Sequence, residues 1–540
     1  MPVFKSKIVV SSDVYDINRR NMLDLVDRLN SLEERAVEVS SKRNKTFEKR
    51  GQIPPHQRIV RLLDSGMPFL RLHTLANYLF EDSNPETSVP GASMICGIGF
   101  VRGVRCMIWA DDSGIRAGAY TPKTVSTALS VQALAIRHKL PLVHMVESAG
   151  ANLMDFTVEN WVDAGAMFKN LARSSAAGIP TLTVLHGPST AGGAYMPGMS
   201  DYVVGIKHNG LAALAGAALV KAATGEEADD RELGGSEMHS STSGLVEYLA
   251  EDDAHGLAIA RDVVGRLNWN NRSSLPCRDM SRAPLHSADE LAGVVPTDYK
   301  VPYDVREVVT RVVDGSEFEE FKPRYGTATV CLQASIMGIS IGIIGNNGPI
   351  DPQGATKAAQ FFQLCDQANM PIIYLHNTTG YMVGTEYEQA GMIKHGSKMV
   401  QASANVGVPK IALFIGASFG AGNYGMCGFS YEPDFLFSWP NASTHVMGGE
   451  QAAKTMTEVT KMVAARKGEK LDSDTLHEQE QKIIAHFVGQ ENAFYCSGRN
   501  LNHGMIDPRD TRKVLGFALE TCLEARAREL RPNSFGVARL

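Results

Sequence analysis

One set of motifs occurs twice in this chain, and this duplication constrains the fold more than any other feature. The segment GIPTLTVLHGPSTAGGAY at 178–195 returns as GVPKIALFIGASFGAGNY at 407–424, an offset of 229 residues (178 to 407). A period this long indicates two copies of one domain and excludes a solenoid of short repeats. Two further pairs occur in the same order at offsets of 230 and 235: PLVHMVESAG (141–150) with PIIYLHNTTG (371–380), and GVRCMIWADD (103–112) with GISIGIIGNN (338–347).

The bulk properties are those of a globular protein with more than one domain. A chain of 540 residues exceeds what one hydrophobic core usually covers. With 44% hydrophobic residues, 21% charged residues and a net charge of −6, the chain has no electrostatic signature of nucleic-acid binding. Eight scattered cysteines without a CxxC pair argue against a zinc site, so we expect no metal. The absence of a long apolar run and of a leader-like N-terminus predicts a cytoplasmic protein, bacterial rather than mitochondrial.

The spacing of apolar residues predicts alternating strands and helices. Two apolar segments around a turn at Arg102–Gly103 predict a strand pair, and helical spacing follows at 124–139 and 160–176. The buried-strand runs PLVHMVE and TLTVLHG alternate with these helices, as strands do in βαβ units. We therefore predict an α/β fold for each copy.

Three regions follow from these patterns. Residues 18–66 are charged and have helical spacing, so 1–66 is predicted to be an N-terminal helical region. The first copy is assigned to 67–275 and the second to 276–540. The boundary falls in 268–300 because this segment is polar, rich in Pro and Ser, and poorly periodic.

Each copy has a turn of small residues directly after a buried strand. The first turn contains Gly192 and Gly193, and the second has Ala421 and Gly422 at the same places. Small residues leave backbone N–H groups open to a ligand, and a helix that starts there adds partial positive charge. Such a turn can stabilise a developing oxyanion. The alternative is close packing of strand against helix without a ligand, and the repetition favours the functional interpretation.

Two familiar motifs in the second copy are interpreted as coincidental. Residues 420–425 read GxGxxG, but a dinucleotide site also needs an acidic residue about 20 positions later, and 438–448 contains none. Residues 416–420 read GxSxG around Ser418, the nucleophile motif of α/β hydrolases. The first copy keeps this serine as Ser189 without the rest of the motif, so we interpret the serine as a turn residue preserved by duplication.

Seven motifs together resemble those of the carboxyltransferase β subunits of biotin-dependent acyl-CoA carboxylases. The resemblance is greatest to the methylcrotonyl-CoA and geranyl-CoA carboxylase subgroup, and it covers most of the chain. The motifs are TAGGAYMPGMSD (190–201), LVKAATGEE (219–227), GNNGPI (345–350), TTGYMVG (378–384), KHGSKMV (394–400), GASFGAGNYGMCG (416–428) and VMGGEQAA (446–453).

The resemblance implies a fold and an assembly. It implies two tandem crotonase-like domains of the ClpP/crotonase type, in agreement with the duplication. Subunits are expected to pair head to tail, within a β hexamer of an α6β6 complex. Acyl-CoA is expected at the N-terminal domain, and carboxybiotin is expected to enter from the C-terminal domain. The biotin belongs to a separate biotinylated α subunit, and this chain has no MKM biotinylation motif.

The resemblance also implies a role for particular residues. The backbone amides of Gly192 and Gly193 are expected to hold the thioester oxygen, and those of Ala421 and Gly422 the ureido oxygen of biotin. Weaker contributors are predicted beside biotin and beside the CoA or acyl chain: Phe419 and Tyr381 for biotin, and Lys221, Gly150 and Ala151 for the acyl-CoA. Core packing is expected for the two tyrosines that recur in both copies, Tyr195 and Tyr424.

Several departures from the family pattern bear on the substrate. Ala217–Ala218 stands where family members usually have two prolines, and the segment 147–153 has a glycine replaced by alanine. These changes predict a wider path for a longer or branched acyl chain. Two alternatives stay open, a biotin-dependent acyl-CoA decarboxylase subunit and a catalytically silent scaffold paralogue. A simple crotonase hydratase needs paired carboxylates, for which Glu147 and Asp155 are the candidates.

Overall fold

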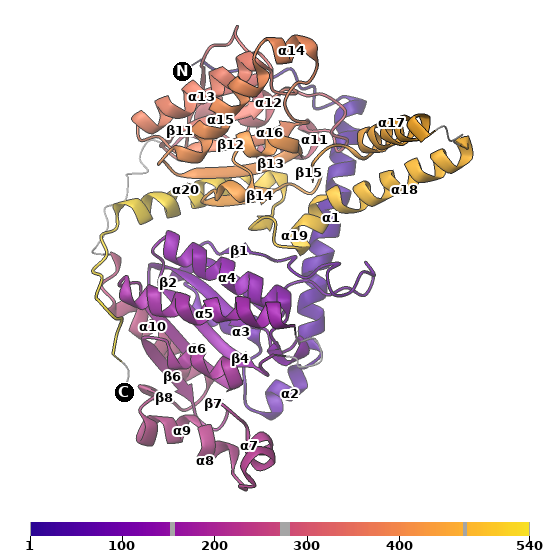
Figure 1. Ribbon diagram of the computed structural model, residues 1–540. Helices are drawn as coiled ribbons and strands as arrows, with labels where there is room; N and C mark the ends of the chain where they lie inside the picture. Colours follow the sequence, from indigo (N-terminus) through magenta and orange to yellow (C-terminus); the bar gives the residue numbers. More distant parts are fainter. Residues whose placement is uncertain (1, 152–156, 271–280, 468–471, 539–540) are drawn as a thin grey trace. The chain divides into compact units, whose positions relative to one another are not determined.

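The computed structural model describes residues 2–151, 157–270, 281–467 and 472–538 (Figure 1). Residues 271–280, which belong to the predicted boundary segment, and Asp155 lie outside this description. The chain divides into two compact units, each with one copy of the duplicated motifs. Unit 1 comprises 1–29, 276–497 and 501–520, and unit 2 comprises 30–275, 498–500 and 521–540.

Unit 2 is built on a sheet with the strand order β1-β2-β3-β4-β5-β6-β8, in which β7 also pairs with β5. The predicted strand pair is confirmed as the antiparallel hairpin β2–β3, with Arg102 and Gly103 at positive φ of 53° and 74°. From β3 to β6 the strands run parallel, so the predicted βαβ units are confirmed. The strands are β1 (Leu70–Leu72), β2 (Met94–Val101), β3 (Val104–Asp111), β4 (Leu142–Ser148), β5 (Thr181–Thr190), β6 (Tyr202–Ile206), β7 (Leu211–Ala213) and β8 (Tyr248–Ala250).

Unit 1 repeats this topology with the order β16-β14-β13-β12-β11-β10-β9 and with β15 beside β13. The register shifts at the same place in both sheets, between Val146 and Ser148 and between His376 and Thr378. The two sheets therefore share the same strand register near the predicted turns. The strands are β9 (Glu319–Glu320), β10 (Thr329–Ile336), β11 (Ile339–Asn346), β12 (Ile372–Thr378), β13 (Lys410–Phe419), β14 (Phe435–Ser438), β15 (Ser443–His445) and β16 (Gly504–Met505).

The helices fall into three groups by the unit to which they belong. Those of unit 2 are α2 (Asn44–Lys49), α3 (Pro55–Leu62), α4 (Pro122–Arg137), α5 (Val158–Ala176), α6 (Tyr195–Gly198), α7 (Ala217–Thr224), α8 (Asp230–Gly234), α9 (Ser236–Met238) and α10 (Asp253–Arg266). Those of unit 1 are α11 (Leu291–Val294), α12 (Val305–Val309), α13 (Pro352–Gln367), α14 (Thr385–Gln389), α15 (Met392–Asn405), α16 (Gly420–Gly425), α17 (Gly449–Lys467) and α18 (Ser473–Glu491). Three helices contribute residues to both units: α1 (Asp13–Ser41), α19 (Ala493–Gly498) and α20 (Thr511–Ala527).

The central strands are buried, and the helices after the hairpins begin alike. Every residue of β3 and β4 is buried, as expected for strands of a parallel sheet that is covered on both faces. In α4 the first residue is Pro122 and the Thr121 hydroxyl caps the helix, whereas in α13 they are Pro352 and the Asp351 carboxylate. Proline at the first position and an oxygen at the cap are the preferred way to start a helix.

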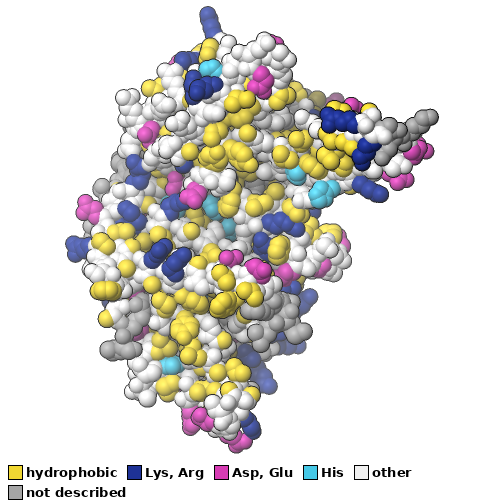
Figure 2. All heavy atoms as spheres, viewed as in Figure 1, with side chains coloured by type: hydrophobic (Ala, Val, Ile, Leu, Met, Phe, Trp, Pro, Cys, Tyr) yellow, Lys and Arg dark blue, Asp and Glu magenta, His cyan; other side chains and the backbone are white. Residues whose placement is uncertain are grey.

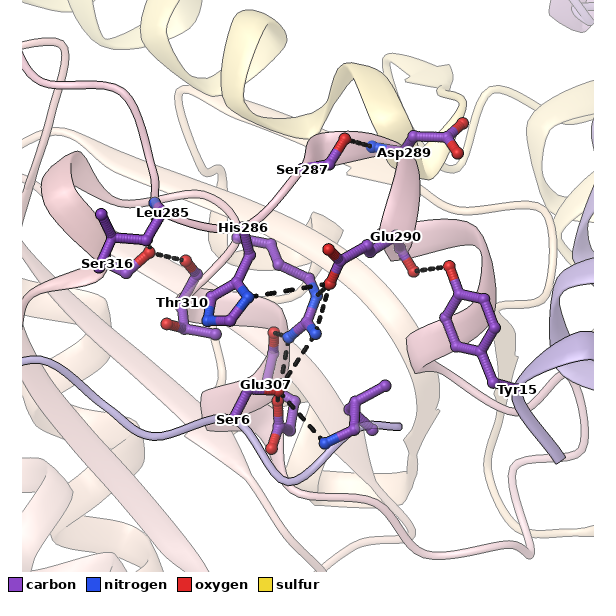
Figure 3. Close-up of polar contacts among 12 residues, drawn as sticks. Ser6, Tyr15, Leu285, His286, Ser287, Asp289, Glu290, Glu307, Thr310 and Ser316 are labelled. Carbon is purple, nitrogen blue, oxygen red and sulfur yellow. Dashed lines mark hydrogen bonds and ion pairs between the residues drawn. The ribbon is translucent and has the colours of Figure 1, made fainter. Parts of the chain in front are cut away.

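An ion-pair cluster joins the N-terminal segment to unit 1 (Figure 3). The guanidinium of Arg311, 1% exposed, pairs with Glu290 at 2.7 Å and with Glu307 at 2.9 Å. The Glu307 carboxylate also accepts hydrogen bonds from the Ser6 hydroxyl and the Lys7 N–H, each at 2.6 Å. This cluster explains why residues 1–29 belong to the unit that contains the second copy.

A helical hairpin of unit 1 carries exposed apolar side chains. α17 and α18 pack side by side and project from the sheet of their unit (Figure 1). Four exposed side chains on α17 have helical spacing, and Figure 2 shows hydrophobic side chains along this projection. They are Met456, Val459, Met462 and Val463. Within the described ranges, none of the helices has the length and hydropathy needed to cross a membrane.

Candidate active site

The first predicted turn begins where β5 ends. The chain leaves Thr190 and enters a single 3-10 turn (Ala191–Ala194), with Ala191 at φ +54°. Gly192 is exposed and Gly193 is buried. N–H groups in the first turn of a helix have no partner within that helix. Gly192 and Gly193 lie in the first turn of a helical segment at the end of a buried strand, so their amides have no partner within that segment.

The second turn repeats this geometry at the end of β13. Gly420 has φ +53°, the conformation that Ala191 adopts in the first copy. Ala421 is exposed and Gly422 is buried, as are their counterparts. A left-handed conformation costs a residue with a Cβ about 1–2 kcal/mol, which glycine avoids. The shared backbone at Ala191 and Gly420 shows that the turn shape itself is retained, even where its residue type is unfavourable.

The loops after β4 and β12 lie against these turns. A Cβ placed on Gly150 would be 3.4 Å from the Thr190 carbonyl oxygen, and one on Gly380 would be 3.6 Å from that of Phe419. Gly150 and Gly380 have φ of 78° and 120°, so both positions favour glycine. The structure thus brings Gly150 to the first turn, whereas Ala151, the next residue, is bridged to Tyr120.

Tyr381 and Phe419, the residues predicted beside biotin, both lie close to the second turn. Tyr381 follows Gly380, and its buried hydroxyl lies against Gly425, where a Cβ would overlap it. Burial raises the pKa of the Tyr381 phenol. The Phe419 side chain is 1% exposed and meets Tyr299 edge to face at 5.0 Å. The contact of either ring with biotin stays a prediction.

Lys221 lies on α7, away from the core of unit 2. Its ammonium is largely exposed and pairs with Glu227 at 2.7 Å. The same helix explains one departure from the family pattern, because the Ala217 N–H donates to the Asp230 carboxylate at 2.7 Å. A proline at 217 could not make this bond, since it has no N–H. A CoA contact of Lys221 stays a prediction.

The expected core packing of the recurrent tyrosines is wrong. Tyr195 is 48% exposed and Tyr424 is 49% exposed. Tyr195 lies on α6 and Tyr424 on α16, and both helices are too short to bury a whole face. Tyr195 meets Phe168 edge to face at 5.8 Å, and Tyr424 stacks on Tyr431 at 5.9 Å. Each turn is therefore flanked by a half-exposed aromatic ring.

Sequence reasoning missed a buried charge cluster beneath the first turn. Arg58 and Glu147, both fully or nearly buried, pair at 2.6 Å. Asp253 accepts from His186 Nδ1 at 2.7 Å and lies 3.5 Å from Arg58. Gly187 must lack a side chain, because a Cβ there would overlap Glu147. The members are too far apart in sequence for any spacing to reveal them.

The partners of Glu147 in this cluster determine its chemical role. Its carboxylate is held by Arg58 and also accepts from Gln52 Nε2 at 3.1 Å, so it is an ion-pair partner rather than a free acid. In the second copy its counterpart is Asn377, which lies against Gly416 in the same way. The buried carboxylate of Glu147 in the first copy is thus replaced by the neutral amide of Asn377 in the second copy. Asp155, the other carboxylate considered for a hydratase, lies outside the described residues, so the pairing of Glu147 with it stays a prediction.

Ser418 of the GxSxG string is not presented to a substrate. The residue is fully buried, and its hydroxyl faces His376 Nδ1 at 2.8 Å and the Asn423 amide nitrogen at 2.8 Å. Burial lowers the pKa of His376 to about 3, so the ring is neutral at physiological pH. A serine enclosed in this way lacks access for nucleophilic attack.

Comparisons with known proteins show the family to which the chain belongs. Residues 47–537 match the family described as the carboxyl transferase domain. A probable biotin-dependent acyl-coenzyme A carboxylase beta2 subunit of Mycobacterium tuberculosis is 45% identical over 492 residues, which cover 91% of each chain. The biotin-dependent 3-methylcrotonyl-coenzyme A carboxylase beta1 subunit of the same organism is 41% identical over 96% of this chain and 97% of its own length.

A solved structure extends the agreement to three dimensions. The beta subunit of geranyl-CoA carboxylase from P. aeruginosa superimposes with a TM-score of 0.93 at 47% identity, covering 100% of both chains. The predicted fold class is thereby confirmed. The chain therefore belongs to the carboxyl transferase family, and its resemblance to the β subunits of acyl-CoA carboxylases is confirmed.

Proposed function

We propose that this chain is the carboxyltransferase β subunit of a biotin-dependent acyl-CoA carboxylase of the methylcrotonyl-CoA or geranyl-CoA type. The observation that carries the proposal is the pair of matching turns, each of which begins a helical segment at the end of a buried strand, where the first backbone N–H groups have no partner within the helix. Transfer of CO2 to an acyl-CoA develops negative charge on two oxygens, one on each reactant. Two turns with the same backbone suit two such oxygens.

The chain's own residues then act mainly through the backbone. The N–H groups of Gly192 and Gly193 stabilise the thioester oxygen as the acyl-CoA loses a proton, and those of Ala421 and Gly422 stabilise the ureido oxygen. Carboxylated biotin, when brought by the partner, supplies the CO2 and accepts the proton. Fixed donors of this kind are each worth about 10²–10³ in rate. The mechanism needs no acidic or basic side chain at either turn, which agrees with the buried, ion-paired state of Glu147.

The second turn fits a ureido oxygen for a chemical reason. The oxygen of a cyclic urea accepts hydrogen bonds only, and the turn offers donors without an acid beside them. The exposed backbone of Ala421 provides access, and the half-exposed ring of Tyr424 flanks it. The turn therefore offers hydrogen-bond donors for the oxygen and an aromatic ring beside it.

The partners follow from the same assignment. A biotinylated α subunit supplies the biotin, and the family assembly is a β hexamer within an α6β6 complex. The exposed apolar face of α17 supports self-association, because a contiguous apolar surface on a monomer is unfavourable in water. On α5, Trp161 and Val162 are also exposed, at 66% and 60%.

The acyl group is proposed to be unsaturated or branched. The beta1 relative is named for 3-methylcrotonyl-CoA and the solved structure for geranyl-CoA, and both acyl chains share an α,β double bond with a γ carbon. Ala217 lies at the start of α7, and its small side chain leaves room where family members have proline. We propose that this room accepts the longer chain.

The test is carboxylation by the complex of this chain with its co-purifying biotinylated subunit. ATP-dependent incorporation of labelled bicarbonate is measured with acetyl-, propionyl-, 3-methylcrotonyl- and geranyl-CoA. We expect incorporation with 3-methylcrotonyl-CoA or geranyl-CoA and little with the saturated short esters. Loss of label from a carboxylated ester without ATP indicates a decarboxylase, and a stable complex without turnover indicates a silent paralogue. Either result refutes the proposal.

A further inference from the structure

A buried polar trio supports the second turn and has no counterpart under the first. Its members are Ser418 at the end of β13, His376 on β12 and Asn423 on α16. The Ser418 hydroxyl lies 2.8 Å from His376 Nδ1 and 2.8 Å from Asn423 Nδ2. Ser418 and His376 are fully buried, and the imidazole packs against Phe414 at 4.5 Å between ring centroids.

The chemistry of the groups fixes the direction of the hydrogen bond between Asn423 and Ser418. The Asn423 amide nitrogen can only donate, so the Ser418 oxygen accepts that bond. The Ser418 hydroxyl and His376 Nδ1 share the second bond, in which Nδ1 accepts or donates according to the tautomer of the ring. Burial holds the imidazole neutral, so one of its two nitrogens carries a proton. The trio therefore forms one chain, from Asn423 to Ser418 to His376.

The duplication supplies an internal comparison. Val146 occupies the place of His376 at the offset of 230 (146 to 376), and Ala194 occupies the place of Asn423 at 229 (194 to 423). In the first copy Ser189 therefore has neither partner, and its hydroxyl donates locally to the Gly193 carbonyl at 2.8 Å. The two copies thus differ at two of the three positions of the trio, one on β12 and one on α16.

Asn423 is itself fixed on its other side. Its carbonyl oxygen accepts the Gly428 N–H at 2.8 Å, and a Cβ on Gly428 would overlap the side-chain amide oxygen. The short helix that contains Ala421 and Gly422 is thus held at its start by Ser418 and at its end by Gly428. Movement of Asn423 would turn the peptide groups of this helix.

We propose that His376 and Asn423 are positioning residues for the second turn, and that they aim the Ala421 and Gly422 N–H groups by holding Ser418. The proposal rests on the proposed function, because it names the residues that orient the donors of the biotin-side oxyanion hole. The His376 side chain is fully buried, and the Asn423 amide nitrogen is engaged by Ser418. The first turn has no such residues, because the Ser189 hydroxyl there donates its hydrogen bond to the Gly193 carbonyl.

The test uses the complex of this chain with its biotinylated partner and three variants. Ser418→Ala removes the centre of the trio, whereas His376→Val and Asn423→Ala restore the residues of the first copy. Ser130→Ala is the matched control, because the Ser130 hydroxyl also bonds a buried histidine, His73, at 2.9 Å, and Ser130 belongs to unit 2 whereas the second turn belongs to unit 1. Melting curves and gel filtration establish that each variant folds and assembles.

Kinetics separate positioning from a general loss of structure. We expect kcat with 3-methylcrotonyl-CoA or geranyl-CoA to fall about 10–100-fold, somewhat less than the loss of one oxyanion donor. The KM for acyl-CoA stays unchanged, because the first turn is intact. The double variant His376→Val/Asn423→Ala falls no further than the worse single variant, since the two act through one serine. His376→Gln recovers most activity because its amide oxygen can accept the Ser418 proton.

A second readout does not depend on turnover. Amide hydrogen exchange of a peptide that covers residues 420–425 is expected to be at least about tenfold faster in Ser418→Ala, and unchanged in Ser130→Ala. Wild-type kcat in all three variants overturns the proposal, and so does a rise in the KM for acyl-CoA that matches the fall in kcat. If the wild-type complex carboxylates neither ester, the proposed function fails, and unaltered exchange in Ser418→Ala then overturns the positioning role by itself.

Discussion

A methyl group added at Gly422 provides the sharpest test of the paired-turn geometry. The new Cβ would lie 2.9 Å from Gly380 Cα and 3.1 Å from Thr378 Cγ2, and both contacts are tighter than packed atoms accept. The nearest neighbour is backbone, so the turn or the β12 loop must move. Overpacking of this kind costs about 1–3 kcal/mol. The same movement takes the Gly422 N–H off its target, for which we expect a loss of about 10²-fold in kcat.

The duplicated copy predicts a contrast. A Cβ on Gly192 would lie 3.8 Å from Phe168 Cζ, an ordinary contact, and the second copy already has Ala421 at this place. Gly192→Ala is therefore expected to retain most of the wild-type rate. Gly198→Ala is the control, because nothing lies within 4 Å of its added carbon.

The assay is incorporation of labelled bicarbonate into 3-methylcrotonyl-CoA or geranyl-CoA by the purified complex, with denaturant melts of each variant. The expected order of rates is Gly198→Ala, then Gly192→Ala, then Gly422→Ala far below both. Wild-type turnover by Gly422→Ala would falsify the role of its amide. Equal losses in Gly192→Ala and Gly422→Ala would show that steric fit at the turn does not control the rate.

Three further predictions concern stability. Glu147→Gln leaves the buried Arg58 guanidinium with Asp253, at 3.5 Å, as its charged partner, so the expected cost in unfolding free energy is below the about 3–5 kcal/mol of a buried charge without a partner. Arg58→Met with Glu147→Leu removes both charges of the pair while Asp253 keeps His186, and is expected to cost less still; denaturant melts of both variants decide. Ala191→Gly relieves the left-handed alanine and is expected to raise the unfolding free energy by about 1 kcal/mol, and an unchanged or lower melting temperature contradicts the strain. The pKa of His376 is about 3 in the folded state against 6.5 normally, so the unfolded state binds the proton first as the pH falls below 6.5. Stability is therefore expected to decrease by about 1.4 kcal/mol per pH unit below 6.5 on account of this residue, and the slope in His376→Gln should be shallower.

The two turns also show how duplicated domains diverge. The backbone is retained to within a degree at Ala191 and Gly420, φ +54° and +53°. The support beneath it is not retained, because Glu147 faces Arg58 in one copy and Asn377 takes its place in the other. A backbone donor constrains only the turn, so the residues under it can change in charge and polarity as long as they fill the same space.

The sequence by itself determined the duplication, the α/β class, the strand pair at Arg102–Gly103 and the two turns. These features rest on local periodicity, on small residues and on one long-range match, all of which are visible in a linear chain. The matched motifs also identified the family.

Only the tertiary structure decided which side chains support those turns and how the termini are shared. His376 and Ser418 are 42 residues apart, and Arg58 and Glu147 are separated by a longer stretch, yet neighbouring strands and a packed helix bring each pair together. Residues 1–29 belong to the unit of the second copy and 521–540 to that of the first, because Arg311 and its carboxylates hold one end and buried contacts hold the other. Burial and pairing of this kind depend on three-dimensional proximity, which residue spacing does not encode.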